Sequence, residues 1–382
     1  MKSSRFALVL VNPFLCLLLI TGPGFGAGPE APVRPVRGSR DEVFSPTYIK
    51  SILLKAAQWQ LRHPKHKPTD WTNGAFYAGV FATYETTKSP ALLDSLLAMG
   101  ERNRWNPGAR FDHADDIAIC QTYIGLYRLK KDRRMIQPTI DSVQKMRTVP
   151  GPELTKHGLT WWWCDALFMA PPVLVQLSTI QNDPTYNTFS DSLFRQTYTL
   201  LYNQQEHLFA RDANYLVDVA GVGKREANGQ KIVWSRGNGW VMGGLVRVLQ
   251  ELPAKHPSRP FYLTLFRQMS ERLLALQQTD GLWRTSLLDP ASYPGGEASG
   301  SGFDCYALAW GVNQGILPKK TYQPAVEKAW IGLTKLVSPE GRVGWVQPIG
   351  GDPRRNFNED SWEVYGTGAF LLAGSQVISL KP

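Results

Sequence analysis

Cysteine is scarce in this chain of 382 residues, which contains only four. Loss of an N-terminal leader, argued below, would leave three: Cys120, Cys164 and Cys305. An odd number argues against a disulfide framework, so buried thiols are expected instead. The sequence has no CxxC pair and no Cys–His spacing that suits zinc, and its glycine-rich stretch lacks the ending of a phosphate loop. It therefore predicts no metal site and no cofactor.

Acidic residues are also in deficit, with 32 Asp and Glu against 42 Lys and Arg, a formal net charge of +10. The basic residues are dispersed and form no stripe, which argues against nucleic acid as a partner. A positive surplus suits an anionic surface or an anionic substrate. Hydrophobic residues make up 43% of the chain, enough to fill a core and to exclude global disorder.

The sequence offers no convincing membrane span. An apolar run over residues 7–20 is too short and too interrupted to cross a bilayer comfortably. Lys2 and Arg5 precede it and small residues up to Ala27 follow it, as in a secretory signal peptide. We expect residues 1–27 to be removed and the protein to be exported to the periplasm or outside the cell, with a retained anchor as the alternative. Cleavage would take two positive charges and leave a net charge of about +8.

Strand-like alternation is scarce as well, and helical periodicity dominates. Residues 28–44 are rich in Pro, Arg and Gly and are predicted to be a linker. Residues 45–382 are predicted to form a single all-α domain. The expected helices are 46–62, 73–87, 90–103, 115–130, 133–148, 164–180, 185–203, 237–252, 258–279, 301–316, 319–337 and 361–377.

A weak internal repeat suggests how these twelve helices are arranged. Short turn-plus-strand pieces at 207–211, 281–284 and 341–345 follow the seventh, ninth and eleventh helices. Six helix pairs with one kind of loop after the odd helices predict a toroid of six helical hairpins, an (α/α)6 barrel. Its inner helices should be rich in small residues, because they crowd together.

Five polar and aromatic segments stand at or just before the starts of even-numbered helices: 70–74, 111–116, 161–165, 234–240 and 296–302. In a toroid all five would open on one rim, which predicts an active site there. Helix N-termini favour negative charge, so an anionic ligand would suit it. Trp71 and Asn73, in the first segment, are predicted to contact that ligand.

Carboxyl groups in these segments are candidates for acid–base chemistry. Asp165 follows three tryptophans and precedes an apolar run, so burial should raise its pKa and let it act as a general acid. Asp115 or Asp116 would be a second carboxyl group, and His113 a substrate hydrogen-bonding group. The alternatives are that Asp165 and Asp115 cap helices, with Asp116 in a first turn.

Arg236 and Trp240 stand four apart at a helix start and therefore share a face. Together they could clamp a sugar acid, the guanidinium on the carboxylate and the indole on the ring. Simple packing of Arg on Trp is the alternative.

Four motifs in order then resemble a known group of enzymes: WWWCDALFMAPP (161–172), WSRGNGWVMGGL (234–245), DGLWRTSLLDP (280–290) and SGSGFDCYALAWGVNQGIL (299–317). They resemble the unsaturated uronyl hydrolases of glycoside hydrolase families 88 and 105, most closely the unsaturated rhamnogalacturonyl hydrolases of family 105. The resemblance runs from about residue 45 to the C-terminus and implies an (α/α)6 barrel.

The resemblance implies an unusual reaction. These enzymes remove a 4,5-unsaturated uronic acid from the non-reducing end of oligosaccharides made by polysaccharide lyases. An acid protonates C4, water adds at C5, and the resulting hemiketal opens, so that the glycosidic bond falls apart. The resemblance assigns acid–base catalysis to Asp165, substrate contact to Trp163, carboxylate binding to Arg236 and ring stacking to Trp240.

The sequence departs from the family at two histidines that some members carry. His157 lies eight residues before Asp165, and Arg211 stands where the later histidine is expected. We predict Arg211 to be a second anion contact, with a surface arginine as the alternative. Two other functions stay open: an (α/α)6 glycosidase or epimerase acting on saturated sugars, and a non-catalytic binder of acidic oligosaccharides.

Overall fold

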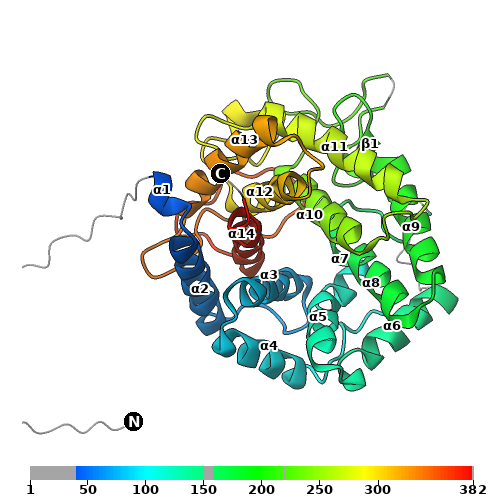
Figure 1. Ribbon diagram of the computed structural model, residues 1–382. Coiled ribbons are helices and arrows are strands. Elements are labelled where there is room, and N and C mark those ends of the chain that lie inside the picture. The colour runs from blue at the N-terminus through cyan, green and yellow to red at the C-terminus, as the bar shows by residue number, and fades with distance from the viewer. Residues whose placement is uncertain (1–39, 150–157, 219, 381–382) are drawn as a thin grey trace, which may run out of the picture. The chain divides into compact units, whose positions relative to one another are not determined.

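Two concentric rings of helices dominate the computed structural model, which describes residues 40–149, 158–218 and 220–380 (Figure 1). The outer ring consists of α2 (Pro46–Arg62), α4 (Pro90–Arg102), α6 (Gln137–Thr148), α9 (Thr185–Leu201), α11 (Arg259–Leu276) and α13 (Lys319–Thr334). The inner ring consists of α3 (Trp71–Thr87), α5 (Cys120–Lys130), α7 (Ala166–Met169) with α8 (Pro171–Gln181), α10 (Ser235–Glu251), α12 (Ala298–Asn313) and α14 (Val364–Val377). Neighbouring inner helices pack together and α14 closes the ring against α3. The predicted (α/α)6 barrel is confirmed.

Some predicted boundaries differ, for local reasons. The helix predicted over 164–180 is split into α7 and α8, because Pro171 and Pro172 cannot donate backbone hydrogen bonds to the turn before them. The helices predicted from 115 and 133 begin with the 3₁₀ turns η1 (Ala114–Ile117) and η2 (Arg133–Met135). The remaining 3₁₀ turns are η3 (Ala213–Tyr215) and η4 (Pro290–Ser292).

The predicted signal peptide, residues 1–27, lies outside the described residues, as does the predicted linker up to residue 39. The end of that linker forms the short helix α1 (Arg40–Val43). Val43 is buried and its carbonyl accepts a hydrogen bond from the Trp330 indole (3.1 Å), so this segment packs on α13.

Turns with a left-handed residue follow α9, α11 and α13, as the weak repeat predicted. The left-handed residues are His207, Gly281 and Gly341, with φ of 53°, 87° and 105°. Only the first turn carries paired strands, β1 (Tyr202–Asn203) and β2 (Leu208–Phe209), which are antiparallel. Of the other two pieces predicted as strands, 341–345 carries one isolated bridge, from Val343 to Val337, and 281–284 carries none.

A four-residue glycine pattern explains how three inner helices approach so closely. Residues 236–239, 299–302 and 365–368 read RGNG, SGSG and YGTG, and each begins at the second residue of its helix. The last glycine of each faces the next inner helix: Gly239 faces α12, Gly302 faces α14 and Gly368 faces α3. A methyl group on Gly368 would lie 2.5 Å from the Ala75 carbonyl oxygen, so the joint that closes the ring has no room for one.

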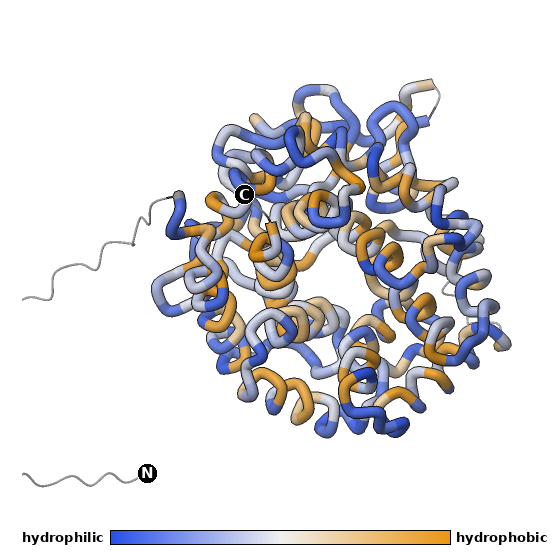
Figure 2. Tube along the Cα trace, in the orientation of Figure 1, coloured by the Kyte–Doolittle hydropathy of each residue, from blue (hydrophilic) through white to orange (hydrophobic). Residues whose placement is uncertain are grey.

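The apolar core lies between the two rings and among the inner helices. Hydrophilic residues are concentrated on the outer edge of the ring (Figure 2). All described residues belong to one structural unit, residues 38–382. Within this described part of the chain, no helix is long and apolar enough to cross a membrane.

Candidate active site

The predicted polar segments meet at the N-terminal ends of the inner helices. The Trp71 ring, at the start of α3, lies 5.9 Å from the Trp240 ring of α10, edge to face. The His113 ring, just before η1, lies 4.8 Å from the Trp163 ring, just before α7. Segments separated by up to 169 positions therefore lie on one rim, as the toroid predicted.

Asp115 and Asp165 interact at this rim. Each keeps part of its surface open, yet burial raises the pKa of both carboxyl groups. For Asp115 the pKa rises to about 7, because burial and then the charge of Asp165 disfavour ionisation. For Asp165 the charges of Arg211 and Arg236 and a hydrogen bond from the Cys164 thiol (3.2 Å) offset part of the rise. The rim thus holds two coupled carboxyl groups beside two arginines.

Helix capping does not explain either group. Asp165 precedes α7, but its side chain makes no capping hydrogen bond. The cap of η1 is His113, whose Nδ1 accepts a hydrogen bond from the Asp115 backbone N–H (3.3 Å). The capping alternatives for Asp165 and Asp115 are therefore wrong.

Asp116 plays a different part from Asp115. It is buried and accepts three hydrogen bonds from Arg110: one from the backbone N–H (2.7 Å), one from Nε (3.0 Å) and one from Nη2 (2.5 Å). A carboxylate held in this way fixes the loop before η1. Of the two candidates, only Asp115 is left to work with Asp165.

His113 is a neutral side chain at this rim. Burial lowers its pKa to about 4, with the charge of Arg110 acting in the same direction. Because Nδ1 accepts the Asp115 N–H, the ring proton is on Nε2, which makes Nε2 a hydrogen-bond donor. His113 can therefore offer a substrate one N–H without adding charge.

Asn73 is less available for contact with a substrate than the sequence suggested. Its amide nitrogen donates to the backbone carbonyls of Lys65 (3.1 Å) and Lys67 (2.8 Å), and the residue is buried. These bonds hold the loop between α2 and α3 behind Trp71. The contacts indicate a structural residue where we predicted a substrate contact.

Arg236 and Trp240 do not form the predicted clamp. Arg236 is 1% exposed and lies between the rings of Trp234 (4.6 Å) and Tyr365 (4.7 Å). Trp240 has no exposed surface, because Trp71 and other aromatic rings cover it. The Arg–Trp packing alternative is nearer to the structure, although the partner is Trp234.

Arg211 acts on Asp165 through its charge and is partly buried, with 23% of its side-chain surface exposed. Its Nη1 donates to Asp212 (2.6 Å), its guanidinium faces the Trp162 ring at 5.5 Å, and its Nε has no partner. Its carbonyl accepts the Cys164 N–H (2.9 Å), which joins this loop to the segment that carries Asp165. Part of the Arg211 side chain stays exposed next to the carboxyl pair, where it can bind an anion. His157, the other residue at which the sequence departs from the family, lies outside the described residues.

Most tryptophans of the rim segments belong to the core. Trp161, Trp163, Trp234 and Trp283 are buried like Trp240. Only Trp71 and Trp162, of the rim tryptophans, keep part of their surface open. An aromatic face for a sugar ring would therefore come from Trp71 or Trp162, and not from Trp163 or Trp240 as predicted.

Tyr365 is a rim residue that our sequence analysis missed. Its ring stacks on Trp71 at 5.3 Å with an 18° interplanar angle, and on its other side it contacts Arg236. The glycine pattern could have identified it, because Tyr365 occupies in YGTG the position that Arg236 occupies in RGNG.

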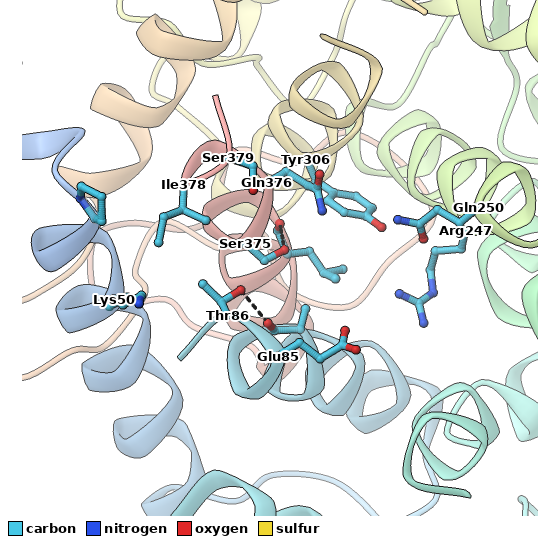
Figure 3. Close-up of a pocket in the computed structure, with 13 residues that line it drawn as sticks. Lys50, Glu85, Thr86, Arg247, Gln250, Tyr306, Ser375, Gln376, Ile378 and Ser379 are labelled. Carbon is cyan, nitrogen blue, oxygen red and sulfur yellow. Dashed lines mark hydrogen bonds between the residues drawn. The ribbon is translucent and has the colours of Figure 1, made fainter. Parts of the chain in front are cut away.

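A second depression lies at the opposite ends of the inner helices, with a volume of about 560 Å³ (Figure 3). None of the candidate residues lines it. Its polar groups bind one another: Tyr306 hydrogen-bonds with Arg247 and Gln250, and Arg247 donates to Gln121. Ser375 and Thr86 each bond to a carbonyl of their own helix. Among the described residues, Glu85 is the one acidic side chain that lines it; burial raises the pKa of Glu85 and the charge of Arg247 opposes that rise, so the depression has no carboxyl pair like the one at the rim.

Metal binding finds no support in the described residues, where no group of three or more His, Cys, Asp or Glu side chains could hold an ion.

Comparison with known proteins gives consistent results. A family model, Glycosyl Hydrolase Family 88, matches residues 48–381. The chain is 42% identical over 344 residues to an unsaturated 3S-rhamnoglycuronyl hydrolase of Formosa agariphila, covering 87% of this chain and 91% of that protein. It is 29% identical to the solved structure of a glycosyl hydrolase family 88 protein from Bacteroides vulgatus (TM-score 0.80, 88% and 100% covered). A structure named as a polysaccharide lyase is 31% identical (TM-score 0.79, 87% and 97% covered).

Proposed function

The chain belongs to glycosyl hydrolase family 88, and on that premise we propose that Asp165 and Asp115 are the carboxyl groups with which this glycoside hydrolase acts on unsaturated uronyl oligosaccharides. The enzyme removes the unsaturated uronic acid from the non-reducing end. The observation that carries the assignment is the coupled pair Asp115–Asp165 beside Arg211, at the rim where the inner helices begin.

The carboxyl pair shares one proton near neutral pH. Two buried acids that repel each other's charge lose their protons in two separate steps, which belong to the pair. The raised pKa of Asp115, about 7, marks the second of these steps. Between the two steps one group is an acid and the other a base, which is what a hydration needs.

Each proton movement has a place in this pair. Asp165, as acid, gives a proton to C4 of the enol ether. The carboxylate of the pair takes a proton from the water whose oxygen adds at C5. The C5 hemiketal then opens to a ketone, the ring oxygen remains on C1 as a hydroxyl, and the hemiacetal at C1 releases the alcohol of the next sugar. No nucleophile attacks the anomeric carbon, so the usual two-carboxylate displacement does not apply.

The bound substrate would itself move the shared proton toward Asp165. In the free protein, Arg211 and Arg236 lower the pKa of Asp165, which favours its charged form. A uronate carboxylate bound at the exposed part of the Arg211 side chain would offset that positive charge and raise the pKa of Asp165. Asp165 is then protonated in the complex, where the acid is required.

The substrate class follows from the relatives. The Formosa protein is named for an unsaturated rhamnoglycuronyl substrate, and we propose that this chain also takes an unsaturated uronate linked to rhamnose. Export by the signal peptide over residues 1–27 completes the proposal, because such oligosaccharides arise where polysaccharides are degraded outside the cytoplasm.

The decisive experiment follows the absorbance of the conjugated enol ether in lyase-generated oligosaccharides. Wild-type protein should remove the band, and Asp165→Asn should slow its loss by about 10²- to 10⁴-fold, the usual contribution of a general acid or base. Asp116→Asn is the matched control, since Asp116 binds Arg110, and a folded Asp116→Asn protein should keep most of the activity. Equal cleavage of saturated oligosaccharides would contradict the hydration route.

One structural relative is named as a polysaccharide lyase, so a lyase activity must be tested as well. The same assay distinguishes a lyase from a hydrolase. A lyase creates the enol ether on a native polysaccharide and increases the absorbance. The proposed hydrolase consumes it and decreases the absorbance. An increase on polysaccharide would therefore contradict the proposal.

A further inference from the structure

We infer that Gln347 is a positioning residue for this active site, which rests on the function proposed above. Gln347 lies in the segment between α13 and α14 and has no exposed surface. It touches no candidate catalytic group directly by its side chain, and nothing in the sequence motifs singled it out.

The side chain of Gln347 ties a loop to α10. Its Oε1 accepts a hydrogen bond from the indole Nε1 of Trp234, the residue that precedes α10 (2.9 Å). Its Nε2 donates to the backbone carbonyl of Asp352 (2.6 Å) and so closes the loop over residues 347–352. Both ends of the amide are used, which fixes its orientation.

The backbone of Gln347 ties two more inner helices to the same point. Its N–H donates to Oε1 of Glu297 (3.1 Å), the side chain that caps α12. Its carbonyl accepts from the Tyr365 hydroxyl of α14 (2.7 Å) and from Nη1 of Arg236 (2.6 Å). One buried residue therefore joins the starts of α10, α12 and α14.

Arg236 depends on this arrangement. Its two terminal nitrogens are held by neighbouring carbonyls, Nη1 by Gln347 and Nη2 by Pro348 (3.0 Å), and its Nε has no partner. Those carbonyls point at the guanidinium only while the Gln347 side chain holds the loop. The charge of Arg236 acts on Asp165, so Gln347 acts on the carboxyl pair through Arg236.

Arg211 meets the same loop from the other side. A methyl group on Gly351 would lie 3.2 Å from the Arg211 Nε, so the loop backbone passes close to that side chain. Gln347 therefore holds both arginines that flank Asp165, Arg236 through its own carbonyl and Arg211 through the loop it closes.

The test compares Gln347→Met with Gln121→Met. Gln121 is an equally buried glutamine that also binds a backbone carbonyl, of Phe168 (2.8 Å), and an arginine, Arg247, but it bonds neither to Arg236 nor to the loop over residues 347–352. Both variants lose a buried amide, so both should lose thermal stability. Only Gln347→Met should lower kcat/KM by about 10- to 100-fold, the cost of a misplacement near 1 Å.

The pH profile distinguishes positioning from a merely structural role. When Arg236 moves away, ionisation of the carboxyl pair becomes harder, so both limbs of the kcat/KM profile should move to higher pH in Gln347→Met. The profile of Gln121→Met should be unchanged. An unshifted profile and an unchanged kcat/KM in folded Gln347→Met would overturn the inference.

Two further measurements keep the result decisive. If Gln347→Met is too unstable to purify, Gln347→Glu keeps an acceptor for Trp234 but loses the donor to Asp352, and should show the same direction of shift. If wild-type protein removes no enol ether, the proposed function fails. A crystal structure of the variant then tests the inference alone: Arg236 should leave the carbonyls of Gln347 and Pro348, and an unmoved Arg236 would refute it.

Discussion

At the scale of single residues, the raised pKa of Asp115 suits acid–base chemistry but lowers the stability of the folded protein at neutral pH. A carboxyl group with a pKa of about 7 in the folded protein and 3.8 when unfolded holds its proton more tightly in the folded state. Its contribution to the free energy of unfolding is fully present below pH 4 and is lost as the pH rises to about 7. The loss amounts to at most about 4 kcal/mol, since each unit of pKa corresponds to 1.36 kcal/mol.

Asp115→Asn should remove the fall in the free energy of unfolding that accompanies ionisation of Asp115. We expect the variant to be inactive and, relative to wild type, more stable at pH 8 than at pH 5, because the amide cannot ionise. Thermal unfolding of both proteins at the two pH values measures the effect. Asp116→Asn serves as the control and should be less stable than wild type at both pH values, since it weakens the bonds to Arg110. A stability difference between Asp115→Asn and wild type that does not change with pH would contradict the raised pKa.

Arg211 gives a second prediction at this scale. Arg211→Met removes a positive charge beside Asp165, so the pKa values of the pair should rise and the alkaline limb of kcat/KM should move to higher pH. The value of KM should also increase if Arg211 binds the uronate. Arg128→Met, which removes the guanidinium that pairs with Glu251 (2.6 Å) away from the carboxyl pair, is the control for a general loss of charge. If the alkaline limb does not move in Arg211→Met, the charge of Arg211 does not affect the pKa values of the carboxyl pair.

At the scale of elements, the glycine pattern predicts unequal tolerance at equivalent positions. Gly368 and Gly239 are each the fifth residue of an inner helix. A methyl group at Gly368 meets backbone at 2.5 Å, whereas at Gly239 the nearest atom is 3.1 Å away. Gly368→Ala should cost about 1–3 kcal/mol through overpacking. Gly239→Ala should cost much less, because alanine gains up to about 1 kcal/mol in helix propensity. Denaturant unfolding compares the two, and equal losses would show that the closeness of α14 and α3 does not matter.

The elements themselves could be predicted because their signal is local. Helix periodicity and turn glycines identified twelve helices, and α2 was predicted to the residue. Proline acts locally too, yet the break at Pro171 was missed because apolar spacing continues through it. The family resemblance predicted Asp165 as the general acid, and its apolar surroundings, with three tryptophans before it, correctly predicted that burial raises its pKa.

Sequence patterns could not predict which side chains from distant segments contact one another. The spacing of Arg236 and Trp240 predicted a shared clamp, but Trp71 and Tyr365 come from distant helices and cover these residues. The choice between Asp115 and Asp116 likewise depended on where Arg110 points. Gln347 hydrogen-bonds with five residues, of which four are 18 to 113 positions away and one lies across a loop, and no local pattern records such contacts.

At the scale of the whole molecule, a large core makes covalent links unnecessary. Cys120, Cys164 and Cys305 are free and buried, and burial raises the pKa of each thiol, to about 12 for Cys120. We expect a thiol reagent at pH 8 to label none of them in the native protein and all three in denaturant. Reducing agent should leave the melting temperature unchanged. Fewer than three thiols in denaturant would reveal a disulfide, and a fourth would show that Cys16, and with it the leader, is retained.

Because α14 closes the ring against α3, the rim can form only late in synthesis and folding. Trp71 and Tyr365 stack on each other, yet almost 300 residues separate them, and Gln347 lies 17 positions before the start of α14. A ribosome must therefore finish nearly the whole chain before the catalytic rim exists, and a contact of such long range is slow to form. Chains that end before α14 should therefore be inactive, because they lack the helix that closes the ring and carries Tyr365.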